Sequence, residues 1–517
     1  MHSPVLGNRV GPFPPAVRTC IRILRVAGAV IALPAAALSR ADVRCPSVFG
    51  DHMVFQRGRP VPIWGEGAPG EKITVEFAGQ SRAAAAAPSG AWRLELAPMA
   101  ASDSPRTLTI RGSNVVRFSD VLVGEVWLCS GQSNMEKPLG PAQGQRPTDH
   151  YREESAWAFH PLVRLYQVPR FGKAAPGLAG LRWLPCSPAA LTDAQFSAAA
   201  YYFGCELQRV LGVPVGLIES SFGGTRIETW MPPEAFAGDP RLRLLAKGRY
   251  EASVPGVQAA ELYHSMMEPL APFALRGFLW YQGEANCLDA ESEVYTAKMR
   301  ALVETWRAIW REPDAPFYYV MLAPFDYSRW DKFPKRLTAE ALPLLWEAQA
   351  RALAVPRTGL VVTTDLVADR HDIHPTDKRD VGLRLAHLAL SESYGYGRIL
   401  ARSPAFEAMR PGPEGTVELS FRDTGGSLAS SDGGALREFT VSGDDRHFVP
   451  AEAEVAGDRV IVRSPFVPRP AAVRFAWRET ADPNLVNAAG LPAIPFRTDA
   501  WPVAAERDRV ETGAPGP

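Results

Sequence analysis

Hydrophobic and polar positions divide the chain into three parts with different periods. In residues 42–120, short stretches alternate polar and apolar positions, and turn residues separate them. The stretches at 72–77, 91–96 and 106–110 are of this kind. Because successive side chains of a strand point to opposite faces, the alternation predicts a small antiparallel β-sandwich module. The alanine run at 83–87 lacks the alternation and is expected to be a loop.

The middle part, residues 121–402, mixes strand and helix patterns. Apolar runs typical of buried strands lie at 126–129, 214–219, 277–281, 317–322 and 360–364. Helical spacing occurs between these runs at 196–211 and 295–310, and after the last run at 377–390. Strands that alternate with helices predict βαβ units and a parallel sheet, with a ligand site at the carboxyl ends of the strands.

The last part, residues 403–517, returns to the period of two. Strand candidates lie at 416–421, 438–441, 459–462 and 472–477. The patterns together therefore predict an α/β core flanked by a β module at each end.

The first 41 residues do not follow the pattern of a folded domain. Three arginines precede an apolar run at 26–38, and small residues follow at 39–41. This order is typical of a secretory signal peptide. A membrane anchor is the alternative, but the run is shorter than the ~20 apolar residues that span a bilayer. We therefore expect export to the periplasm or the medium, with no stable membrane insertion once the leader is removed.

Net charge and cysteine content argue against three features: a nucleic-acid partner, a zinc site and a dense disulfide scaffold. The 56 basic and 56 acidic residues give a net charge of zero, which removes the electrostatic reason to expect a nucleic-acid partner. Five of the six cysteines lie outside the leader and none forms a CxxC pair, so neither a zinc site nor a dense disulfide scaffold is indicated. One bridge, for example Cys186–Cys205, would suit an oxidising compartment, but the sequence does not fix the pairing.

Four polar strings follow predicted strands of the middle part. The first, CSGQSNM at 129–135, places Ser133 in a glycine-flanked turn after a buried strand, where an activated hydroxyl nucleophile would stand. It is not the GxSxG elbow, because Met135 occupies the last glycine position. A turn that only caps a helix is the alternative interpretation.

The second and third strings supply candidate hydrogen-bond donors. SSFGGTR at 220–226 contains Gly223 and Gly224, which allow the backbone to approach a ligand closely. WYQGEAN at 280–286 ends in Asn286, whose amide could donate a hydrogen bond or merely cap a helix.

The fourth string, DRHDIHP at 369–375, supplies a candidate base. His374 with Asp372 two residues earlier could form a base and the carboxylate that orients it. The two histidines and two aspartates could instead bind a metal, but no further ligand pair at a recognised spacing accompanies them, so no metal site is predicted. A solvated loop is the third interpretation.

Together the strings hold a nucleophile, a base, a carboxylate and extra donors at the ends of different strands. A donor aimed at a developing oxyanion stabilises the transition state by ~2.7–4 kcal/mol, so their convergence would suffice for acyl transfer.

The four strings resemble those of the sialate O-acetylesterase family, which belongs to the SGNH (GDSL-like) hydrolases. The resemblance extends to FGDHMVFQ at 49–56, VPIWG at 61–65 and NLVN at 484–487, so it covers nearly all of the chain after the leader. It implies a three-layer α/β/α sandwich with a parallel sheet, flanked by N-terminal and C-terminal β-sandwich-like modules.

The resemblance also implies catalytic roles. Ser133 would be the nucleophile and His374 the general base, oriented by Asp372. In the wider superfamily the carboxylate often stands three residues before the histidine, a position that His371 occupies here. Asp369 or a backbone carbonyl therefore remains an alternative to Asp372.

The implied oxyanion hole consists of the N–H groups of Ser133 and Gly223 and the amide of Asn286, with Gly224 as an alternative to Gly223. Candidate substrate contacts beside it are Gln132, Gly224, Trp280, Gln282 and Glu284.

The implied activity is that of an exported serine esterase that hydrolyses O-acetyl esters of sugars, most of all sialic acids, without a metal or an organic cofactor. Its partner would be an O-acetylated sugar or glycan. An esterase for acetylxylan or another polysaccharide is the alternative within the enzyme class. A non-catalytic carbohydrate-binding protein is the alternative outside it.

Overall fold

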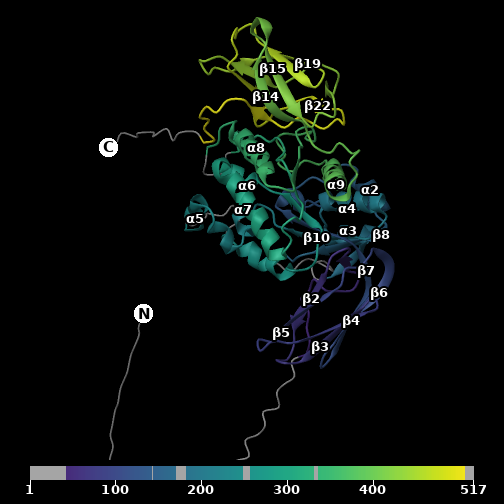
Figure 1. Cartoon of the computed structure of the whole chain (residues 1–517). Coiled ribbons are helices and arrows are strands. Elements are labelled where there is room, and N and C mark those ends of the chain that lie inside the picture. The colour runs from purple at the N-terminus through teal and green to yellow at the C-terminus, as the bar shows by residue number, and fades with distance from the viewer. Residues whose placement is uncertain (1–41, 143, 170–181, 248–256, 331–335, 507–517) are drawn as a thin grey trace, which may run out of the picture. The chain divides into compact units, whose positions relative to one another are not determined.

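The structure is a computed structural model, shown for the whole chain in Figure 1. It describes residues 42–142, 144–169, 182–247, 257–330 and 336–506. The expected signal peptide, residues 1–41, lies outside the described residues. The chain from Ala41 onward is one compact unit, so the division into modules at residues 120 and 402 stays a prediction.

A row of seven strands within an 11-stranded sheet forms the core of the middle part. Its strands, in spatial order, are β13 (Thr358–Val361), β12 (Phe317–Val320), β11 (Gly277–Tyr281), β7 (Val115–Gly131), β10 (Val215–Ser221), β8 (His160–Gln167) and β9 (Trp183–Cys186). All neighbours are parallel except β8 and β9. The predicted parallel sheet is therefore confirmed, with one antiparallel strand at its edge.

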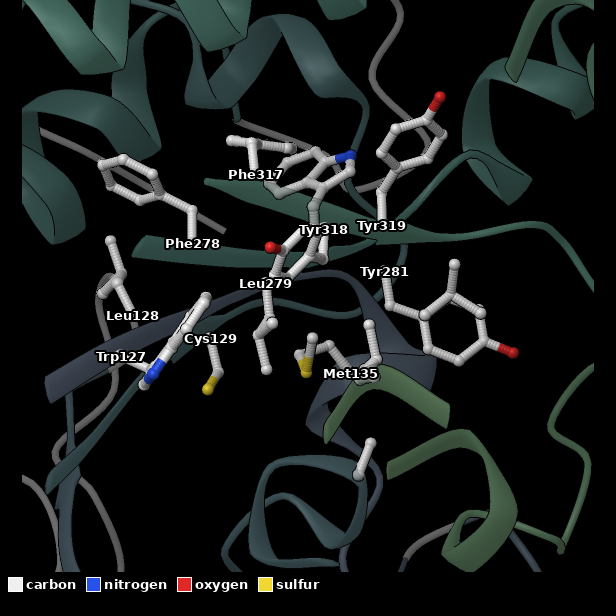
Figure 2. Packing of buried hydrophobic residues seen from close by; sticks show 14 of the residues in the cluster. Trp127, Leu128, Cys129, Met135, Phe278, Leu279, Tyr281, Phe317, Tyr318 and Tyr319 are labelled. Carbon is white, nitrogen blue, oxygen red and sulfur yellow. The ribbon is translucent and has the colours of Figure 1, made fainter. Parts of the chain in front are cut away.

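Helices cover both faces of this sheet. The principal ones are α4 (Ala198–Leu211), α7 (Ser292–Trp310), α8 (Ala341–Arg351) and α9 (Arg379–Tyr394). On β12, the Tyr318 hydroxyl lies 2.7 Å from Ser393 of α9, whereas the Tyr319 hydroxyl donates over 2.7 Å to the Gln349 carbonyl of α8. Figure 2 shows Tyr318 and Tyr319 among the buried side chains of the neighbouring strands. Neighbouring residues of a strand point to opposite faces, so α9 and α8 lie on opposite sides of the sheet. This is the expected three-layer α/β/α sandwich.

The remaining helices are short. They are α1 (Ser133–Glu136), α2 (Tyr151–Trp157), α3 (Pro188–Ala194), α5 (Pro240–Lys247), α6 (Glu284–Leu288), η1 (Ile227–Trp230), η2 (Pro233–Phe236), η3 (Tyr263–Met267), η4 (Glu268–Leu270), η5 (Tyr327–Arg329), η6 (Ala352–Ala354) and η7 (Pro413–Gly415). Two of them, α1 and α6, begin directly after strands β7 and β11 and carry residues of the first and third strings.

The N-terminal part consists of strands, as predicted. They are β1 (Val54–Gln56), β2 (Val61–Glu66), β3 (Lys72–Phe77), β4 (Gln80–Ala85), β5 (Ala91–Leu96) and β6 (Ser102–Arg111). The expectation of a loop at the alanine run was wrong, because Ala83–Ala85 complete β4 and pair with β3. Strand β7 has 17 residues and pairs with β6 before it enters the central sheet. One continuous strand thus crosses the predicted boundary at residue 120.

The C-terminal part forms small antiparallel sheets. Its strands are β14 (Ala405–Pro411), β15 (Val417–Arg422), β16 (Leu428–Ser430), β17 (Phe439–Ser442), β18 (Val449–Pro450), β19 (Glu452–Ala456), β20 (Arg459–Arg463), β21 (Ala472–Phe475), β22 (Leu485–Asn487) and β23 (Phe496–Arg497). They pair as β14-β15-β20-β19, β18-β17-β21-β23 and β16-β22. The alternation of polar and apolar residues after residue 403 therefore predicted strands correctly.

The five cysteines outside the leader are free thiols in the structure, so the suggested bridge between Cys186 and Cys205 is not formed there. In the part of the chain that the structure describes, no helix combines the length and apolar character needed to span a membrane.

Candidate active site

The polar strings converge because β7, β10 and β11 are parallel neighbours that end at the same edge. The turns after them are tied together: the Gln132 N–H donates to the Tyr281 carbonyl over 3.0 Å, and the Phe222 N–H donates to the Gly131 carbonyl over 3.1 Å. Gly131 has a φ of +144°, and a Cβ there would stand 2.1 Å from the Tyr281 carbonyl oxygen. Only glycine fits this crossing point, from which the chain turns into α1.

Ser133 and His374 lie next to each other. Ser133 is the first residue of α1, and His374 lies in the loop between β13 and α9. Although 241 residues separate them in sequence, His374 Nε2 is 2.9 Å from Ser133 Oγ. That distance is within the hydrogen-bonding reach of a nucleophile and its base. Both residues are partly exposed, so a substrate can reach them.

The surroundings of His374 favour its neutral form. Burial, the largest cause, together with the ammonium groups of Lys378 and Lys137 lowers the pKa of His374 to about 4, whereas Asp372 opposes the shift. A neutral imidazole carries one proton, so Nε2 can accept the Ser133 proton when Nδ1 holds that proton. Near pH 7 His374 is therefore in the protonation state that a general base needs.

Neither candidate carboxylate bonds to the imidazole ring within the described ranges. Asp372 Oδ1 accepts the backbone N–H of His374 over 2.9 Å, and its Oδ2 lies 3.6 Å from Arg146 Nε. Asp369 accepts the backbone N–H of His371 over 2.9 Å and forms a 2.5 Å ion pair with Arg146. Asp372 thus bonds to the backbone of His374 itself, whereas Asp369 bonds to the backbone of His371.

Gly223 lies against the nucleophile. A Cβ at Gly223 would stand 3.2 Å from the Ser133 Cβ, so any larger residue would press on the serine. The Gly223 N–H donates to Glu136 Oε2 over 2.9 Å. The Ser133 N–H is the first of helix α1 and has no acceptor in a preceding helical turn. Gly224 follows with a φ of +75°, which completes the turn.

Asn286 belongs to a buried ionic network. Its Nδ2 donates to Glu228 over 3.0 Å and to Glu291 over 2.8 Å, and Lys298 bonds to both carboxylates. Its Oδ1 accepts a hydrogen bond from Gln282 over 2.7 Å. Both amide hydrogens are thus committed to carboxylates, and the structure does not direct this amide to the space beside the serine.

Four of the candidate substrate contacts are buried below the site. Gln132, Trp280, Gln282 and Glu284 are each at most 3% exposed. Gln282 Nε2 donates to Gln132 Oε1 over 3.1 Å, which joins the turns after β7 and β11. The Trp280 ring packs edge-on against a neighbouring tryptophan, Trp306, in the core. These side chains support the catalytic turns and do not line an open surface.

Residues that sequence reasoning did not select complete the surroundings. Asn134 Nδ2 donates to Glu284 Oε1 over 2.5 Å and to the Ile373 carbonyl over 3.0 Å, which links the serine turn to the histidine loop. Burial raises the pKa of Glu284 to about 7. Asn134 could have been noticed, because it follows the serine directly. The burial of Lys137 and Lys378 has no signal in the sequence.

The histidines and aspartates of the fourth string point to different partners. The His371 Nδ1 lies 3.6 Å from Asp326, whereas His374 bonds to Ser133. Across the described ranges, no group of three or more His, Cys, Asp or Glu side chains is placed to hold a metal ion.

Comparisons with known proteins place this geometry in context. Residues 123–391 match the family model described as carbohydrate esterase, sialic acid-specific acetylesterase. The chain is similar to the sialate O-acetylesterase of Homo sapiens, with 30% identity over 396 residues, covering 70% of this chain and 73% of that protein. Similarity to the Mus musculus protein of the same name is 28% over 426 residues, covering 70% and 75%. A solved carbohydrate acetylesterase from Xanthomonas citri is 35% identical, with a TM-score of 0.78, and the match covers 89% of this chain and all of that one.

Proposed function

Because the chain belongs to the sialic acid-specific acetylesterase family of carbohydrate esterases, we propose that it removes O-acetyl groups from sialic acids through an acetyl-enzyme on Ser133. The broader activity, that of a carbohydrate acetylesterase, follows from the family and from the similar solved structure. The hydrogen bond between Ser133 Oγ and His374 Nε2 is the observation that supports the catalytic part of the proposal.

In the first half of the reaction, Ser133 Oγ attacks the acetyl carbonyl carbon while its proton passes to His374 Nε2. The tetrahedral intermediate collapses as His374 returns the proton to the sugar oxygen, which leaves as a hydroxyl. In the second half, His374 takes a proton from water as the water attacks the acetyl-enzyme. Acetate then leaves and Ser133 recovers its proton.

We assign the oxyanion hole to the backbone N–H groups of Ser133 and Gly223. Gly223 lies against the serine, so its N–H reaches the same space. The Glu136 carboxylate accepts this N–H in the structure, and the substrate oxygen would take its place. We assign Asn286 a supporting role, because its amide holds Gln282 and through it Gln132.

A panel of acetylated glycans tests the substrate class. We expect the purified protein to release acetate from O-acetylated sialic acid with a higher kcat/KM than from acetylxylan, measured by enzymatic detection of acetate. A clear preference for acetylxylan would favour the polysaccharide esterase. Binding of the glycans without acetate release from any of them would favour the carbohydrate-binding protein.

We also propose that the protein is exported, on the basis of the leader pattern at residues 1–41. N-terminal sequencing of the protein recovered from the producing cells should begin close to residue 42. Recovery of full-length protein confined to the cytoplasm would contradict this.

Asp372 is the carboxylate that we propose to support His374. Its side chain bonds to the His374 backbone, and its charge favours the imidazolium that forms during catalysis. We expect Asp372→Asn to lower kcat/KM about 30-fold, or roughly 2 kcal/mol. Asp369→Asn, the matched control in the same loop, should change it less than about threefold, since Asp369 pairs with exposed Arg146. A larger loss of kcat/KM in Asp369→Asn than in Asp372→Asn would instead assign the supporting role to Asp369.

A further inference from the structure

The backbone on either side of His374 is held by buried side chains. Asn134 Nδ2 donates to the Ile373 carbonyl over 3.0 Å, and Lys378 Nζ donates to the Pro375 carbonyl over 2.7 Å. Between them, the His374 N–H donates to Asp372 over 2.9 Å. Three consecutive residues are thus each fixed by one polar side chain, and the ring has Ser133 as its side-chain partner among the described residues.

Lys378 is an unusual residue to find in this position. It is 0% exposed at the start of α9, and within the described ranges its ammonium has no ion-pair partner. Its neighbours are the Pro375 carbonyl and the face of the Tyr281 ring, whose centroid lies 5.6 Å away. Burial lowers the pKa of Lys378 to about 7. Among the residues that the structure describes, no carboxylate forms an ion pair with this ammonium, although Glu284, Asp377 and Asp372 attract it from a greater distance. Burial of a charge that is only partly compensated destabilises a fold, so its position indicates a local role of Lys378.

Asn134 acts from the other side of the histidine. It follows the nucleophile directly and is 1% exposed, and its second amide hydrogen bonds to Glu284 over 2.5 Å. The same side chain thereby fixes the distance between the serine turn and the histidine loop. Lys378 fixes the far end of that loop to α9, which packs on the sheet.

We propose that Lys378 is a positioning residue that, together with Asn134, holds the loop carbonyls beside His374 and so keeps the imidazole in line with Ser133. This deepens the proposed function and rests on it. In the described residues, no carboxylate bonds to Nδ1 of the imidazole. The hydrogen bonds to the Ile373 and Pro375 carbonyls would therefore orient the ring in place of a carboxylate. Neither residue touches the substrate or the reacting atoms.

Lys378→Met tests the proposal, because methionine fills a similar volume without the ammonium. A displacement of about 1 Å in a catalytic group can cost 10²-fold in rate. We therefore expect kcat on an acetyl-ester chromogen to fall about 30-fold while KM changes less than about twofold. The charged groups that face His374 are Asp372, Lys378 and Lys137. Loss of the Lys378 charge should also move the acidic limb of kcat/KM to higher pH.

Lys137→Met is the matched control. Lys137 is buried after α1, and its Nζ donates to the Arg146 carbonyl over 2.5 Å, not to the histidine loop. It should reproduce the shift of the acidic limb, because it removes a similar charge, but should keep kcat on the plateau within about threefold. An equal loss of kcat in both variants would overturn the proposal, since the effect would then not depend on the Pro375 carbonyl.

Asn134→Ala provides a second variant in case Lys378→Met does not fold, with folding checked by circular dichroism. We expect it to lower kcat about tenfold at unchanged KM, since one of the two carbonyls remains held. A folded Lys378→Met or Asn134→Ala protein with wild-type kcat would overturn the proposal. Failure of the proposed function is distinguishable, because the wild-type protein itself would then hydrolyse no acetyl ester.

Discussion

Ser133→Ala is expected to lower kcat/KM for acetyl-ester hydrolysis by about 10⁴-fold or more, without loss of the fold. Alanine lacks the Oγ that lies 2.9 Å from His374, so no acetyl-enzyme can form. The remaining donors and the binding site can accelerate attack by water only weakly. Initial rates on an acetyl-ester chromogen, compared at equal concentrations of folded protein, measure the effect.

Ser130→Ala is the control for this experiment. Ser130 lies three residues earlier on β7, is buried, and its Oγ has no hydrogen-bond partner among the described residues. The Ser130→Ala substitution also removes a serine Oγ, but from the strand that precedes α1, and we expect an activity close to that of the wild type. Substantial activity in a folded Ser133→Ala protein would contradict the assignment of the nucleophile.

His374→Ala is expected to lower kcat/KM by a similar factor, about 10⁴-fold, because no other base accepts the serine proton. The pH dependence of wild-type activity should also report the protonation of His374. Since the pKa of His374 is lowered from 6.5 to about 4, Nε2 is free to accept a proton above that pH. Activity should therefore persist through weakly acidic solution and fall as the pH drops through about 4.

His371→Ala is the matched control in the same loop. His371 is exposed and its nearest ionic partner is Asp326, so its loss should change kcat/KM less than about twofold. An acidic limb near pH 6.5 would contradict the burial of His374, and a comparable loss in His371→Ala would contradict its role.

The hydrophobic pattern predicted the parallel sheet because buried strands and amphipathic helices leave different periods. It also predicted the convergence of Ser133 and His374, because carboxyl ends of parallel strands share one edge. The alanine run is the clearest failure of this reasoning. A run of identical small side chains shows no alternation of polar and apolar positions. Ala83–Ala85 belong to a strand because their backbone pairs with β3, which the sequence pattern does not reveal.

The site was predicted less fully than the fold. The strings identified Asn286 as a donor, but which way its amide points depends on Glu228 and Glu291, which lie on other elements. The contact between the Gly223 N–H and Glu136 likewise depends on a side-chain conformation. Sequence patterns carry the identity and order of residues, whereas these contacts arise only when separate elements pack together.

Covalent labelling tests the central claim most directly. A serine-directed fluorophosphonate requires a serine hydroxyl activated by a neighbouring base, which is what the Ser133–His374 contact provides. After treatment of the wild-type protein, mass spectrometry should find a single adduct, located on Ser133 by peptide mapping, together with loss of esterase activity. Complete inactivation with the adduct on a different residue, or full activity after labelling of Ser133, would contradict the account.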